Sequence, residues 1–407
     1  MLRIALYHNL PSGGGKRALF EMVRRLAAKH EIDVYTLASA ERDFWSLQPF
    51  SRQHVVFPFR PLPLTRRPLG RLNQGIRTLD LLRLRALEQR IARRIDGEGY
   101  DIAFVHNCQY GQSPGLLSFL RTPSVYYCQE PPRWIYEPAV PRLYSTFSTF
   151  QRIGNQLDPL PYIYRRALIH FDRQNVSAAG LVLVNSAYSR ESLYRVYGIF
   201  AQVCYLGVDT ERFRPLSLPR TDFALSVGAL TPRKGFDFLL HSLALIHNDR
   251  RPRLVIVSNF SDGNEHAYLQ GLAKRLGVAV EFHIRIADDE LVRLYNQALL
   301  TAYSPIMEPF GFVPIESMAC GTPVVGVREG GIRESVVDGE TGILTDRDPE
   351  HFAQAVEALL NDPARRAHLG QQGRLYVEKR WQWARSVSDL ENYFARVKRP
   401  SPQRTDS

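Results

Sequence analysis

The sequence lacks any long hydrophobic segment and any closely spaced pair of cysteines. A helix needs about 20 successive apolar residues to cross a bilayer, and no stretch of the chain approaches that length. The apolar N-terminal residues are too few for a secretory signal and fit a first strand instead. The four cysteines are Cys108, Cys128, Cys204 and Cys320, without zinc-site or disulfide spacing. We therefore expect a cytoplasmic protein with reduced cysteines.

The glycine-rich segment NLPSGGGKR, residues 9–17, lacks the features of a nucleoside-triphosphate loop. Such a loop needs a glycine where this chain has Leu10, and a Ser or Thr for magnesium where it has Arg17. A dinucleotide fingerprint is matched loosely by Gly13, Gly15, Ala18 and Asp33. Three interpretations stay open: a phosphate-binding turn, the nicotinamide site of an oxidoreductase, and a plain turn between strand and helix.

Acidic residues are fewer than basic ones, which gives a formal net charge of +11. Much of the excess is one cluster: Arg60, Arg66, Arg67, Arg71, Arg77, Arg83, Arg85, Arg90, Arg93 and Arg94. This arginine cluster is suited to anionic lipid or an acidic glycan, or is simply the solvated face of a helix. No nucleic-acid-binding motif accompanies it, so nucleic acid is not expected as a partner.

Hydrophobic periodicity predicts a parallel α/β fold. A buried strand at residues 2–8 is followed by the glycine turn, by a helix with Leu19, Met22, Val23 and Leu26 on one face, and by a strand at 34–37. Further strands are predicted at 102–105, 124–127 and 181–184. After the proline-containing segment 213–220 the pattern restarts, with a strand at 223–227, a helix at 236–246 and a strand at 254–257. Two doubly wound domains that face each other across a cleft explain this repeat.

The richest segment is EPFGFVPIESMACGTPVV, residues 308–325. Pro314 fits the first turn of a helix, and Gly321 fits its end. Glu308 precedes this helix and Glu316 lies within it, among small and apolar residues where an unpaired carboxylate is costly. Carboxylates accept several hydrogen bonds, so the pair is suited to the hydroxyls of a sugar or ribose.

These segments together resemble the retaining glycosyltransferases of family 4, which have the GT-B fold and use nucleotide-sugar donors. The resemblance covers nearly the whole chain. It rests on the glycine turn with Arg17 and on NSAYS (185–189), LGVDTERFRP (206–215), PRKG (232–235), DDELVRLYNQA (288–298), the 308–325 segment and EGGIRESVVDGETG (329–342). Their order and spacing are specific.

The resemblance implies a role for individual residues. Glu316 would hold the ribose hydroxyls, and Glu308 a hydroxyl of the donor sugar. Lys234 would bind the diphosphate and stabilise its departure. The remaining donor-side residues are Gly14, whose backbone would approach the phosphate, and the helix start at Phe310, Gly311 and Phe312. His106, at the end of the strand 102–105, matches a histidine near the reacting sugar.

One position departs from the family. Relatives commonly have an arginine where this chain has Ala229, so the leaving diphosphate would lose a bidentate partner. We expect Arg233 or Arg17 to compensate. The departure also keeps open a non-catalytic GT-B partner subunit, and the fold keeps open a nucleotide-sugar epimerase.

The acceptor side is predicted in the first domain. Arg17, Arg133, Trp134 and Tyr136 are its candidate residues, the last three within YYCQEPPRWIYEP (126–138). With the arginine cluster, they predict a peripheral enzyme at the inner face of the membrane that acts on a glycan or lipid-linked acceptor in surface polysaccharide or glycolipid synthesis.

The predicted reaction transfers a hexose-type sugar, such as mannose, glucose or an N-acetylhexosamine, with retention. No Asp-x-Asp cluster stands out, so we expect a metal-independent enzyme without a cofactor. The predicted bounds are 1–214 for the acceptor-side domain, 215–222 for the linker, 223–382 for the nucleotide-sugar domain, 383–398 for a helix that crosses back, and 399–407 for a disordered tail.

Overall fold

The computed structural model describes residues 1–66, 69–142, 144 and 158–398. The strands of the first lobe are β1 (Arg3–Asn9), β2 (Glu31–Leu37), β3 (Gln53–Phe57), β4 (Ile102–Cys108), β5 (Ser124–Tyr127), β6 (Leu181–Val184) and β7 (Gln202–Val203). They form one parallel sheet in the order β3-β2-β1-β4-β5-β6-β7. The first lobe also contains α1 (Gly14–Leu26), α2 (Asn73–Gly97), α3 (Arg133–Tyr136), α5 (Pro159–Ser177) and α6 (Ala187–Tyr197).

The second lobe has its own parallel sheet. Its strands are β8 (Phe223–Val227), β9 (Arg253–Ser258), β10 (Val280–Ile284), β11 (Leu300–Tyr303), β12 (Val324–Val327) and β13 (Gly342–Thr345), in the order β10-β9-β8-β11-β12-β13. Its helices are α7 (Phe236–Ala244), α8 (Gly263–Leu276), α9 (Asp288–Gln297), α10 (Phe312–Ala319), α11 (Ile332–Ser335), α12 (Pro349–Asn361) and α13 (Pro363–Arg380). The chain ends in α14 (Trp383–Val397).

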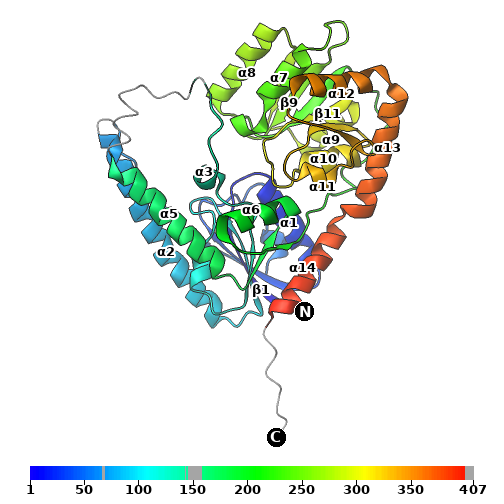
Figure 1. Cartoon of the computed structure of the whole chain (residues 1–407). Helices are drawn as coiled ribbons and strands as arrows, with labels where there is room; N and C mark the ends of the chain where they lie inside the picture. The colour runs from blue at the N-terminus through cyan, green and yellow to red at the C-terminus, as the bar shows by residue number, and fades with distance from the viewer. Residues whose placement is uncertain (67–68, 143, 145–157, 399–407) are drawn as a thin grey trace.

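Both sheets are covered on both faces, because alternate strand residues enter different cores. In β1, Ile4 and Leu6 pack with α1, whereas Ala5 and Tyr7 pack with α2. Strands buried on both faces read as continuous hydrophobic runs, which is why these segments were recognisable in the sequence. The predicted α/β fold with two doubly wound lobes is therefore confirmed (Figure 1).

The first lobe carries a pair of long helices, α2 and α5, which lie side by side and run in the same direction; we call this pair the helical limb (Figure 1). Arg85 of α2 ties the pair together, since its guanidinium donates to Asn175 at 3.2 Å and to Gln174 at 2.9 Å. The cluster arginines from Arg77 to Arg94 all lie on α2. Arg67 lies outside the described residues. The limb was not predicted as a structural unit.

The terminal helix α14 lies against the first lobe, although it follows α13 of the second (Figure 1). Phe394 packs edge to face on Phe104 of β4, with ring centroids 5.1 Å apart. The crossing point is tight, because Val208 N–H donates to the Trp381 carbonyl at 2.7 Å. The predicted domain bounds remain a proposal, and the predicted tail, 399–407, lies outside the described residues. Among the described residues, no helix combines the length and apolar character needed to span a membrane.

Gly207 is the residue at which this crossing leaves no room for a side chain. A Cβ there would lie 2.5 Å from the Trp383 backbone nitrogen. We expect Gly207→Ala to lower the free energy of unfolding by about 1–3 kcal/mol, the usual cost of overpacking. Urea denaturation measures the effect. Gly97→Ala is the control, because a Cβ at Gly97 meets nothing within 4 Å. Equal stabilities of the two variants would contradict the assignment.

Candidate functional site in the cleft between the lobes

A cavity of about 420 Å³ lies where the two lobes meet. This volume falls in the range of roughly 300–1,000 Å³ typical of small-molecule sites. The first lobe contributes the glycine loop, residues 10–16, and the second contributes residues 308–312. Of the predicted site residues, Gly14, Glu308, Phe310, Gly311 and Phe312 line this cleft.

Both lining loops follow the carboxyl ends of central strands. The glycine loop follows β1 and leads into α1, whose N-cap Gly13 has φ 146°. The opposite loop follows β11 and leads into α10, whose N-cap Gly311 has φ 82°. A Cβ at Gly311 would lie 2.2 Å from the Tyr303 hydroxyl oxygen, so only glycine fits there. Ligands of doubly wound sheets bind at this edge, where strand order reverses.

Glu308 and Lys234 form an ion pair beside the cleft. Lys234 Nζ lies 2.8 Å from Glu308 Oε1, and both side chains are about one quarter exposed. Burial acts to raise the pKa of Glu308, but the charges of Lys234 and Arg133 outweigh it and hold that pKa below its usual value. The aliphatic part of Lys234 rests on Gly228, where a Cβ would lie 3.2 Å from Lys234 Cδ. The pair is therefore ionised and fixed.

Glu316 is buried and is shared between the lobes. Its Oε1 accepts from Arg17 Nη1 at 2.5 Å, and its Oε2 accepts from the Tyr295 hydroxyl at 2.9 Å. Arg17 also lies over the rings of Phe213 and Phe312, at 4.9 and 5.6 Å from their centroids. The structure thus brings Arg17 to the predicted ribose-binding carboxylate.

Further contacts join the lobes around the cleft. Arg233 donates to Glu137 at 2.7 Å and to the Pro138 carbonyl at 3.0 Å, while Arg133 donates to the Ile306 carbonyl at 2.7 Å. Neither Arg233 nor Arg17 points freely into the cleft, since each guanidinium is held by a carboxylate across the lobe boundary.

His106 lies behind the cleft wall that Asn107 and Cys108 form. It is fully buried, and its ring stacks on Tyr127 with centroids 5.3 Å apart. Burial, followed by the charge of Lys16, lowers the pKa of His106 to about 3. Neither ring nitrogen has a hydrogen-bond partner within the described residues. The imidazole is therefore neutral, and its catalytic role stays a prediction.

The other acceptor-side candidates lie outside the cleft, toward the helical limb. Trp134 is 60% exposed and faces the limb. The Tyr136 hydroxyl donates to Asp172 at 3.0 Å, which fixes the ring against Tyr197. The structure therefore separates these two residues from the cleft wall around Glu308.

Two further ionisable residues line the cleft: Lys16, from the predicted basic glycine turn, and Glu130, which the sequence interpretation missed. Burial and then the nearby Glu308 carboxylate raise the pKa of Glu130 to about 7, and its Oε2 has no hydrogen-bond partner within the described residues. Burial lowers the pKa of Lys16 to about 8. Lys16 was visible in the glycine turn, but no sequence signal distinguished Glu130 from an ordinary loop residue.

The second glycine turn, residues 329–334, is not among the residues that line the cleft cavity. Gly330 and Gly331 pack under the Glu308 loop, where their Cβ atoms would lie 2.3 Å from the Glu308 and Pro309 carbonyl oxygens. Gly331 N–H donates to the Glu308 carbonyl at 2.8 Å. This turn supports the position of Glu308. Within the described part of the chain, no three His, Cys, Asp or Glu side chains are grouped as metal ligands; metal independence stays a prediction.

Comparisons with solved structures identify the architecture. A sucrose-phosphate synthase from Thermosynechococcus elongatus superposes with a TM-score of 0.74 at 21% identity, covering 98% of this chain and 99% of the other. HepE of Anabaena, solved with UDP-glucose, superposes with a TM-score of 0.68 at 18% identity, covering 98% and 100%. Two Rossmann-like lobes about one cleft form the GT-B fold of glycosyltransferases.

Family models cover most of the sequence. "Glycosyltransferase Family 4" matches residues 12–212, and "Glycosyl transferases group 1" matches residues 208–376. A D-inositol 3-phosphate glycosyltransferase from Acidothermus cellulolyticus is 31% identical over 411 residues, covering 93% of this chain and 84% of the relative. A protein of the same name from Thermomonospora curvata is 30% identical, covering 88% and 85%. The chain belongs to the family 4 glycosyltransferases.

The contact between Arg17 and Glu316 predicts a stability effect. Arg17→Ala leaves Glu316 buried without its cation, so we expect a loss of about 3–5 kcal/mol of unfolding free energy. Arg24→Ala is the matched control on the same helix, because Arg24 is more exposed and pairs with Asp209 and Glu21. This control variant should lose about 1 kcal/mol of unfolding free energy or less. Urea midpoints measure both. Similar losses for the two variants would show that Arg17 is not a special contact.

Proposed function

We propose that the chain transfers a hexose-type sugar from a nucleoside-diphosphate sugar to a glycan or lipid-linked acceptor, with retention of configuration. The observation that carries the proposal is that Glu308 faces the glycine loop across one cleft, with Lys234 bonded to Glu308 and Glu316 bonded to Arg17 of the helix that follows the glycine loop. Carboxylates for hydroxyls, an ammonium for phosphate and free backbone amides are the groups that a nucleotide sugar requires. HepE, which shares the fold, was solved with UDP-glucose.

The proposed donor complex uses both ends of the 308–316 segment. Glu316 accepts from the ribose hydroxyls with the lone pairs that Arg17 and Tyr295 leave free. Glu308 accepts from a sugar hydroxyl, and the amides at the start of α10 lie beside it. Gly14 exposes backbone toward the phosphates.

In the proposed reaction, the acceptor hydroxyl attacks the anomeric carbon on the face from which the diphosphate leaves. The leaving phosphate oxygen takes the proton of that hydroxyl. Lys234 stabilises the negative charge that develops on the diphosphate, and it needs no reorganisation because Glu308 already holds it. Neutral His106 contributes no positive charge to this step.

Ala229 leaves the diphosphate without the arginine common in relatives, and we keep Arg233 and Arg17 as its proposed substitutes. Each must first exchange its carboxylate partner, Glu137 or Glu316, for the diphosphate. Arg17 is the nearer to the glycine loop, since it lies in the first turn of α1.

We also propose that the enzyme works in surface polysaccharide or glycolipid synthesis, as a peripheral protein on an anionic cytoplasmic membrane face. The arginines of α2 and the exposed Leu72, Leu79 and Leu82 support this proposal. A second candidate acceptor is an inositol phosphate, which the names of the relatives indicate.

Product analysis tests the function. Purified protein is incubated with UDP-, GDP- and ADP-sugars, with acceptor extracts and with chelator. We expect sugar transfer with retained configuration and unchanged rates after chelation. Conversion of the donor sugar without an acceptor would indicate an epimerase. Tight donor binding without any product would indicate a non-catalytic partner subunit. Stabilisation of the folded protein by NAD would indicate an oxidoreductase.

The two carboxylates should affect different parts of the donor. Glu316→Gln should weaken binding of a nucleoside diphosphate and of the corresponding nucleotide sugar equally, by tenfold or more. Hydrogen bonds to charged groups contribute about 1.5–3 kcal/mol to binding. Glu308→Gln should weaken binding of the sugar nucleotide more than binding of the nucleoside diphosphate, because only the sugar nucleotide brings the hydroxyl that Glu308 holds. Thermal shifts across ligand concentrations measure both affinities. The same loss pattern in both variants would contradict the assigned roles.

A further inference from the structure

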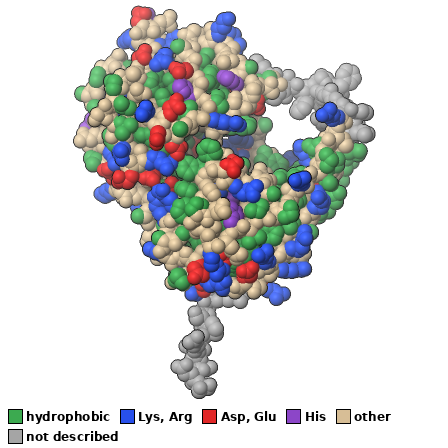
Figure 2. Space-filling model, turned by 180° about the vertical axis from the view of Figure 1, so that it is seen from behind, with side chains coloured by type: hydrophobic (Ala, Val, Ile, Leu, Met, Phe, Trp, Pro, Cys, Tyr) green, Lys and Arg blue, Asp and Glu red, His purple; other side chains and the backbone are tan. Residues whose placement is uncertain are grey.

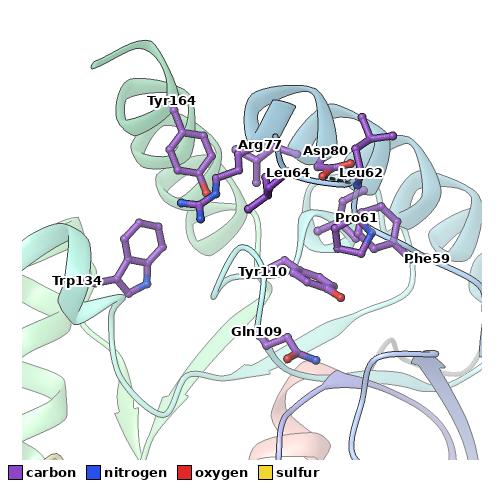
Figure 3. A pocket seen from close by; sticks show the side chains of 12 residues that line it. Phe59, Pro61, Leu62, Leu64, Arg77, Asp80, Gln109, Tyr110, Trp134 and Tyr164 are labelled. Carbon is purple, nitrogen blue, oxygen red and sulfur yellow. Dashed lines mark hydrogen bonds between the residues drawn. The ribbon is translucent and has the colours of Figure 1, made fainter. Parts of the chain in front are cut away.

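A second cavity lies between the helical limb and the loop that carries Trp134. It has a volume of about 440 Å³. Figure 3 shows its lining side chains: Arg77 from α2 and Tyr164 from α5 face Trp134 across the opening, with Leu62 and Leu64 nearby. We call this cavity the limb groove. From behind, hydrophobic and basic side chains lie side by side along the limb (Figure 2).

The walls of the limb groove are mainly apolar. They include Phe59, Leu62, Leu64, Leu81, Leu84 and Trp134. Leu64 is 49% exposed and Trp134 is 60% exposed, so large hydrophobic side chains face open space on the same cavity. Concave apolar surface of this kind marks a binding site for an apolar ligand.

One cation stands in this apolar setting. Arg77 makes no hydrogen bond or ion pair within the described residues, whereas the neighbouring Asp80 is engaged by Arg83 at 2.6 Å and by the Leu62 amide at 2.9 Å. Arg77 also lines an adjoining polar cavity of about 560 Å³, together with Arg165 and the acidic Glu137. Glu137 is paired with Arg133 and Arg233. Arg77 is thus available to an anionic group at the mouth of the apolar groove.

The limb groove adjoins the cleft. Gln109 lines both cavities, and its amide is held by the Ser39 carbonyl at 2.7 Å. A ligand with an apolar chain in the groove therefore places its polar end toward the cleft, on the first-lobe side. A fully polar acceptor would leave the leucines and Trp134 in water.

We propose that the limb groove binds the hydrocarbon chain of a lipid-phosphate-linked acceptor, with Arg77 on its phosphate. This inference rests on the proposed function, because it supplies the acceptor for sugar transfer in the cleft. The chain lies along the leucines and the phosphate lies at the mouth. The saccharide that follows the phosphate extends past Gln109 toward Glu308.

Calorimetric titration of the full chain with farnesyl phosphate, an isoprenoid monophosphate, tests the inference. We expect one molecule to bind per chain, and Leu64→Asn to weaken binding at least tenfold. Leu79→Asn is the matched control, since Leu79 lies on α2, is equally exposed at 49% and is not part of the groove wall. Arg77→Gln should weaken the binding of farnesyl phosphate and leave the binding of farnesol unchanged, because farnesol lacks the phosphate.

Four results would overturn the inference. The first is that farnesyl phosphate does not bind, and the second is that Leu64→Asn and Leu79→Asn weaken its binding equally. The third is that inositol 3-phosphate binds more tightly than farnesyl phosphate, in a way that depends on Arg77. The fourth is that the protein binds anionic vesicles that contain no farnesyl phosphate, and that both leucine variants abolish this binding. Nucleoside-diphosphate binding, followed by thermal shift in the same variants, separates the two proposals. Donor binding without farnesyl phosphate binding overturns only the limb groove, and absent donor binding overturns the proposed function.

Discussion

The hydrogen bond from Arg17 to Glu316 is the contact on which the shape of the cleft depends. It joins the first helix of one lobe to the buried carboxylate of the other, and aromatic rings from both lobes enclose the guanidinium. A carboxylate has about four lone pairs, and Arg17 and Tyr295 use two. A ribose held by Glu316, as proposed, would share this carboxylate with the first lobe, so donor binding would be coupled to the contact between the lobes through one side chain.

Charge balance governs the rest of the cleft. Glu308 and Glu130 approach each other closely enough for the first to raise the pKa of the second, yet only Glu308 has a lysine at hydrogen-bond distance. The two carboxyl groups therefore divide into an ionised one and one that titrates near neutral pH. Like charges at one site favour such a division, because ionising both without partners is costly. A substrate that brings hydroxyls and a diphosphate supplies donors for one group and negative charge for the lysine.

The sequence predicted those parts of the structure in which local pattern and burial agree. Strands such as 223–227 and the helix from Trp383 to Val397 were found within a residue or two of their bounds, because continuous apolar runs and amphipathic spacing are local signals. Arg17 was assigned to the glycine turn but lies in the first turn of α1, and its partner is 299 residues away, a contact that no local pattern specifies. The helical limb was missed for a similar reason: α2 has arginines around much of its surface, so its apolar stripe is faint.

The two lobes differ in what their sequence must encode. On the second lobe the cleft is built from strand ends, tight glycines and a short helix, in which Gly311, Gly330 and Gly331 admit no side chain. On the first lobe, two long segments, between β3 and β4 and between β5 and β6, contain α2, α3 and α5. Those additions carry the basic charge and exposed apolar surface, whereas the cleft residues of the second lobe follow the family pattern. If the limb groove holds the acceptor as proposed, selectivity for it would reside in the limb, which contacts its own sheet, whereas the loops of the second lobe are fixed by β8 and β11.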